Sequence, residues 1–113
     1  MSASQAPALS AIAFQLAAAL DAYEQDVALL VRSPVDPEAY HRVSQHMDQM
    51  RMYAAALPPV AVAWVEVMIR HFELTHGLWR PHAQQADLKQ LHARLREAVR
   101  SLSRKCVLLM PAA

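Results

Sequence analysis

Hydrophobic residues recur at every third or fourth position along three stretches of this chain, at 9–30, 40–57 and 88–102. Such steps place the side chains on one face of an α-helix, because the helix completes a turn in about 3.6 residues. Each stretch therefore predicts a helix that buries one face against its neighbours.

The stretch 60–79 differs because it is apolar over most of its circumference. Its clear polar positions, Glu66, Arg70 and Glu73, form one narrow line at helical spacing. A helix with so little polar surface must be covered on several sides, so we expect it to be the central helix of a bundle. Val65 and Ile69 are expected to form an outward apolar face. The residues expected to face the core are Trp64, Met68, His71 and Thr75.

Prolines and one glycine mark the expected ends of the helices. Pro34 should end the first helix, because the residue before a proline avoids the helical region. Asp36 suits the N-cap of the second helix, which the proline pair at 58–59 closes. Gly77 is expected to be a left-handed C-terminal cap of the third helix, and Pro81 to open the fourth.

Four helices joined by short links predict an all-α, up-down-up-down four-helix bundle. The 113 residues include a single glycine, whereas sheet proteins need turn glycines. We expect one domain over 1–113, with 1–8 disordered.

The composition favours a cytoplasmic protein without a membrane span. The N-terminus lacks the basic region of a signal peptide, and the one cysteine forms no internal disulfide. The net charge of +1 does not indicate a partner, although residues 80–113 carry seven bases against two acids.

Part of this basic charge lies on one flank of the last predicted helix, at Lys89, Arg96, Arg100 and Arg104. These four bases, here called the predicted basic stripe, are candidate partner-binding residues for nucleic acid phosphates, anionic lipid or an acidic protein. Alternatively, they form a solvated flank that pairs with the acidic first and second helices.

Two Glu-x-x-His pairs resemble half of the ligand set of a di-iron four-helix bundle, Glu38 with His41 and Glu73 with His76. The helical pattern turns both pairs away from the core, so we expect no metal site and no cofactor. His71, on the core face, is expected to be a neutral buried residue.

No arrangement of residues indicates an enzyme. Cys106 follows two basic residues, which can lower the pKa of a thiol, but it also lies on the apolar face of its helix and is expected to act as a small core residue.

We therefore expect a protein that acts by protein–protein interaction, as an adaptor, chaperone or regulator. The surplus apolar surface of 60–79 predicts a homodimer in which Val65 and Ile69 contact the second copy. The alternatives are a nucleic-acid-binding regulator that uses the predicted basic stripe, and a metal-binding bundle enzyme.

Overall fold

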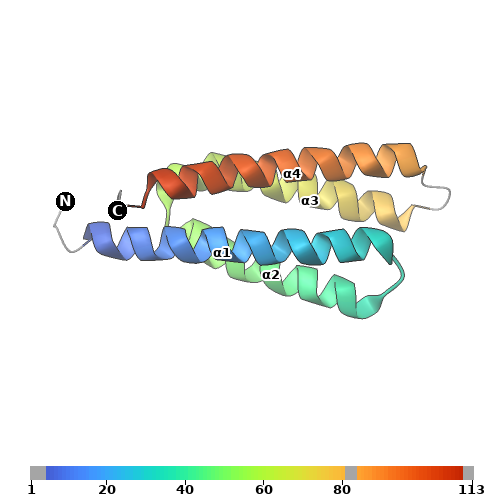
Figure 1. Cartoon of the computed structure of the whole chain (residues 1–113), viewed down its shortest axis with the longest axis horizontal. Helices are drawn as coiled ribbons and strands as arrows, with labels where there is room; N and C mark the ends of the chain where they lie inside the picture. Colours follow the sequence, from blue (N-terminus) through green and yellow to red (C-terminus); the bar gives the residue numbers. More distant parts are fainter. Residues whose placement is uncertain (1–4, 81–83, 111–113) are drawn as a thin grey trace.

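The computed structural model describes residues 5–80 and 84–110, and these residues form four long helices. Their bounds are α1 (Gln5–Arg32), α2 (Pro37–Ala55), α3 (Ala61–Trp79) and α4 (Gln85–Leu108), with a short 3-10 helix, η1 (Pro58–Val60), before α3. Each long helix runs antiparallel to the one before it (Figure 1), in a bundle 54 Å long. The predicted all-α, up-down-up-down four-helix bundle is confirmed.

The start of α2 is the one that the sequence predicts. The Asp36 carboxylate accepts a 3.0 Å hydrogen bond from the Glu38 backbone N–H, and Pro37 occupies the first position of α2. The first helix starts at Gln5, within the segment 1–8 that was expected to be disordered. The rest of the N-terminal segment predicted to be disordered, and the role predicted for Pro81, lie outside the described residues.

The helices pack as two hairpins, α1 with α2 and α3 with α4, which join mainly through α1 and α4. Although α2 and α3 are antiparallel and joined by a short link, the contact between them is small. The core contains most of the hydrophobic residues whose three–four spacing predicted α1, α2 and α4, while Leu9, Ile12, Tyr40 and Leu91 are only partly buried. Its largest fully buried side chains are Tyr23, Leu16, Leu20, Leu30, Met50, Leu57, Leu74, Leu95, Leu102, Val43, Val60 and Val67.

The buried face of α3 is rotated from the predicted one. Trp64 and His71 are buried as expected, but Val67 and Leu74 complete the face, while Met68 and Thr75 are only partly buried. The cause is the packing partner, because α3 lies chiefly against α4 and turns its buried face toward that helix.

Gly77 does not cap α3, so this prediction was wrong. The helix continues to Trp79, and Gly77 is buried inside it. A Cβ atom at Gly77 would lie 2.9 Å from Leu91 Cδ1 and 3.3 Å from Leu88 Cδ2. The glycine therefore permits the close approach of α3 and α4 at this end of the bundle.

Substitutions at Gly77 test this packing role by urea denaturation. Gly77→Ala should change the free energy of unfolding by less than about 1 kcal/mol, because the higher helix propensity of alanine offsets a small displacement of the Leu91 methyl group. Gly77→Leu should destabilise the protein by about 1–3 kcal/mol, because no space exists for the longer side chain. A loss above about 2 kcal/mol for Gly77→Ala would contradict the proposed role.

Candidate functional site

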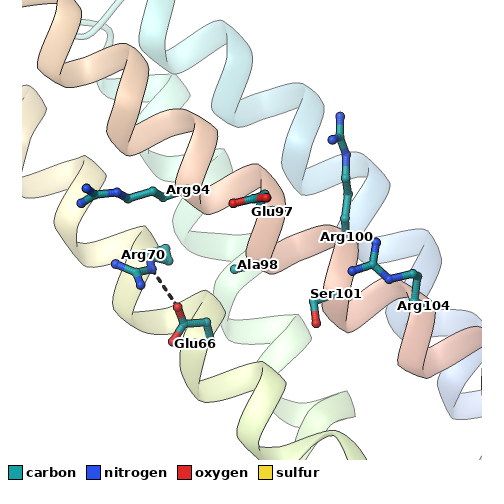
Figure 2. A pocket seen from close by; sticks show the side chains of 8 residues that line it. All are labelled: Glu66, Arg70, Arg94, Glu97, Ala98, Arg100, Ser101 and Arg104. Carbon is teal, nitrogen blue, oxygen red and sulfur yellow. Dashed lines mark hydrogen bonds and ion pairs between the residues drawn. The ribbon is translucent and has the colours of Figure 1, made fainter.

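A groove of about 400 Å³ separates the solvent-facing edges of α3 and α4. Two small residues of α4, Ala98 and Ser101, leave this space between the helices, and charged side chains surround it (Figure 2). The complete lining of what we call the α3–α4 groove is Glu66, Arg70, Arg94, Glu97, Ala98, Arg100, Ser101 and Arg104.

On the α3 side of the groove, Arg70 is paired with two glutamates of the same helix. Arg70 Nε donates to Glu66 at 2.8 Å, and Arg70 Nη1 donates to Glu73 at 2.9 Å. These hydrogen bonds, chiefly the one to Glu66, raise the pKa of Arg70. The predicted polar line of α3 is therefore an ion-pair network that neutralises much of its own charge.

On the α4 side, the arginines are free. Among the described residues, Arg94, Arg100 and Arg104 have no ion-pair partner. In Figure 2, Arg94 extends from α4 toward Arg70, and Arg104 bends back along α4 in the direction of Ser101. The Arg100 guanidinium instead points away from α3. Arg94 and Arg104 are thus the cations that the groove presents.

All four residues of the predicted basic stripe are exposed, but only two of them line the groove. Arg100 and Arg104 line the groove, whereas Lys89 and Arg96 do not. Arg94, which is not part of the predicted basic stripe, also lines the groove. The reason is that the groove follows the α3-facing edge of α4, which the pattern of α4 alone does not identify.

The acidic side chains of α1 and α2 are not the partners of these bases in the described part of the chain. Asp26 of α1 pairs with two residues of α2, His46 at 2.7 Å and Arg42 at 3.4 Å. Asp48 pairs with Arg51 one turn away, at 2.7 Å. The acids shown to be paired therefore stay within the α1–α2 hairpin.

A second candidate surface is the side of α3 that faces away from the core. It carries residues at alternating steps of three and four, here called the outer stripe: Val62, Val65, Ile69, Phe72, His76 and Trp79. Exposed fractions are 85% for Val62, 64% for Phe72 and 72% for Trp79, and near one half for Val65 and Ile69. Val65 and Ile69 lie on the outer face as predicted, and their role in binding stays a prediction.

Sequence reasoning named only two residues of the outer stripe and missed its length. The available signal was a second three–four repeat on 60–79, offset from the one that faces the core. Trp79 also packs one ring against Tyr40 of α2, with ring centroids 5.2 Å apart, so the stripe reaches the edge of α2.

The centre of the bundle contains a buried polar pair that joins α1 to α3. The Tyr23 hydroxyl and His71 Nδ1 are 2.8 Å apart. Burial lowers the pKa of His71 to about 4, which confirms that it is neutral at physiological pH, and burial together with Glu24 raises the pKa of Tyr23. The Oε1 atom of Glu24, the next residue after Tyr23, is buried and has no hydrogen-bond partner among the described residues.

The two Glu-x-x-His pairs face outward as predicted. Glu38, His41 and His76 are exposed, and Glu73 binds Arg70. Within the described residues, no group of three or more His, Cys, Asp or Glu side chains converges on a possible metal position. Cys106 is buried in the core, and burial raises the pKa of its thiol, so its basic neighbours do not activate it.

Comparison of the chain with protein families, with curated proteins and with solved structures gives no match. None of the helices in the described residues combines the length and apolar character that a membrane crossing requires. Inference about function therefore rests on the α3–α4 groove and the outer stripe.

The Tyr23–His71 pair predicts a pH dependence of stability. An unfolded histidine binds a proton below pH 6.5, whereas folded His71 binds one only below about pH 4, so stability falls as the pH decreases between these values. The loss attributable to His71 should reach about 2 kcal/mol at pH 5 relative to pH 8. Denaturation at both pH values, on the wild type and on His71→Gln, isolates this contribution. Equal pH dependence of the two proteins would contradict it.

Proposed function

We propose that this chain works by binding proteins, as a cytoplasmic adaptor, chaperone or regulator, and that the outer stripe of α3 is its principal contact surface. The observation that supports the proposal is the row of exposed residues on the side of α3 opposite the core, in which all but His76 are apolar. Burying one such side chain stabilises an association by about 1.5–3 kcal/mol. Large apolar patches on soluble monomers usually mark interaction sites.

A second copy of the chain fits the outer stripe best, because the stripe is complementary to itself. In an antiparallel pairing about a twofold axis, Val62 meets Trp79 of the second copy and Val65 meets His76. Ile69 then meets Phe72 at the centre. Each layer sets a smaller side chain against a larger one, and the steps of three and four match the seam of an antiparallel helix pair.

The flanks of the outer stripe are compatible with this pairing. On the α2 side lie Met68 and Thr75, which are uncharged and partly buried. On the α4 side, Glu66 and Glu73 are already paired with Arg70, which limits their repulsion from the same residues of a second copy. A cytoplasmic location agrees with the free thiol of Cys106, the only cysteine of the chain.

We expect light scattering coupled to gel filtration to give a mass close to twice the 12.6 kDa of one chain at micromolar concentration. Ile69→Glu should give single chains, because it places a charge in the centre of the buried seam. Met52→Glu is the matched control, since Met52 is an apolar residue of α2 with 75% exposure outside the stripe, and it should leave the dimer intact. A wild-type mass of one chain throughout would refute the homodimer.

Cross-linking tests the antiparallel arrangement separately. When a Val62→Cys chain is mixed with a Trp79→Cys chain under mild oxidation, the mixed disulfide should dominate, because the pairing brings these two positions together. The buried Cys106 should not compete. Dominant disulfides between identical chains would instead indicate a parallel pairing.

A further inference from the structure

We propose that the α3–α4 groove is a second binding site, which takes an acidic segment of a partner protein. In this site Arg94 and Arg104 bind carboxylates of the segment, one toward each end of the groove. The groove lies on the α4 side of α3, beside the outer stripe but not part of it, so its occupant can differ from the second copy that covers the stripe.

The inference rests on two exposed arginines of α4 that line the groove, Arg94 and Arg104. Arg94 and Arg104 have no ion-pair partner among the described residues, whereas Arg70 across the groove is held by two carboxylates. A guanidinium group has five N–H donors in a rigid planar fork that matches a carboxylate in two parallel hydrogen bonds. The space above Ala98 and Ser101 admits a ligand to this position, and the Ser101 hydroxyl adds another hydrogen-bonding group.

The charges in the groove favour a protein ligand over a nucleic acid. Glu66 and Glu97 line the same groove, and their carboxylates would repel a continuous run of phosphates. None of the described residues that line the groove is aromatic, so they offer bases no surface on which to stack. A protein segment can place carboxylates opposite Arg94 and Arg104 and leave neutral or basic residues opposite the glutamates.

The spacing of the two arginines sets the size of the segment. Arg94 and Arg104 are ten residues apart on α4, which corresponds to about 15 Å along the helix axis. A helical segment of about three turns spans this distance with acidic residues near both ends. Among the described residues no acid of this chain pairs with Arg94 or Arg104, so the proposal assigns these carboxylates to a partner.

The test is fluorescence anisotropy at about 0.1 M salt, where charges more than about 10 Å away are screened, with a labelled alanine-based peptide of about 16 residues that carries two glutamates near each end. The wild type should bind this peptide. The double variant Arg94→Gln with Arg104→Gln should bind it at least about tenfold more weakly, because both carboxylate contacts are lost. The matched control, Lys89→Gln with Arg96→Gln, removes the same charge from α4 outside the groove and should stay within about twofold of the wild type.

Three results would overturn the proposal. The first is no binding of the peptide by the wild type, and the second is an equal loss of affinity in both double variants, which would indicate diffuse electrostatic attraction. The third is tighter binding of a single-stranded oligonucleotide of similar length than of the peptide, which would indicate a phosphate site. Circular dichroism checks that the variants remain helical. Ile69→Glu should retain peptide binding, so the groove is tested independently of the homodimer.

Discussion

The contact between α3 and α4 determines where both candidate surfaces lie. The two helices approach closely at Gly77, where a Cβ atom would collide with the side chain of Leu91. Farther along, the small residues Ala98 and Ser101 leave the α3–α4 groove open at the surface. Because α3 packs on α4 far more than on α2, the bundle covers one face of α3 and leaves the opposite apolar face in solvent.

A buried polar pair also favours the observed register of α1 and α3 over alternative packings. Tyr23 and His71 satisfy each other in a core that is otherwise apolar, and they do so only when α1 and α3 are in the observed register. A shift of either helix would leave a phenol and an imidazole buried without partners, which costs about 1–3 kcal/mol for each group. The pair therefore selects one packing of the helices, in addition to the stabilisation that the apolar contacts provide.

The distribution of ion pairs divides the molecule into two halves with different surface chemistry. In the α1–α2 hairpin, Asp26 bridges the helices, and Asp48 binds Arg51 of the same helix. On α4, by contrast, the arginines of the groove have no ion-pair partner within residues 5–80 and 84–110. The α3–α4 hairpin thus carries both the uncovered apolar face and the uncompensated positive charge, and both proposed binding sites belong to this half.

The sequence by itself determined the helices, their order and most of the core, because the three–four repeat and the cap at Asp36 act within one helix or between neighbours in the chain. It also indicated that His71 is buried and neutral, and that Val65 and Ile69 face outward. Tertiary structure alone decided the rotation of α3, the packing role of Gly77 and the choice of Arg94 rather than Lys89 for the groove. The physical reason is that these features depend on which helix lies beside which. A helical repeat specifies the direction in which a side chain projects from the helix axis. Only the packing of the bundle determines which neighbouring helix lies in that direction.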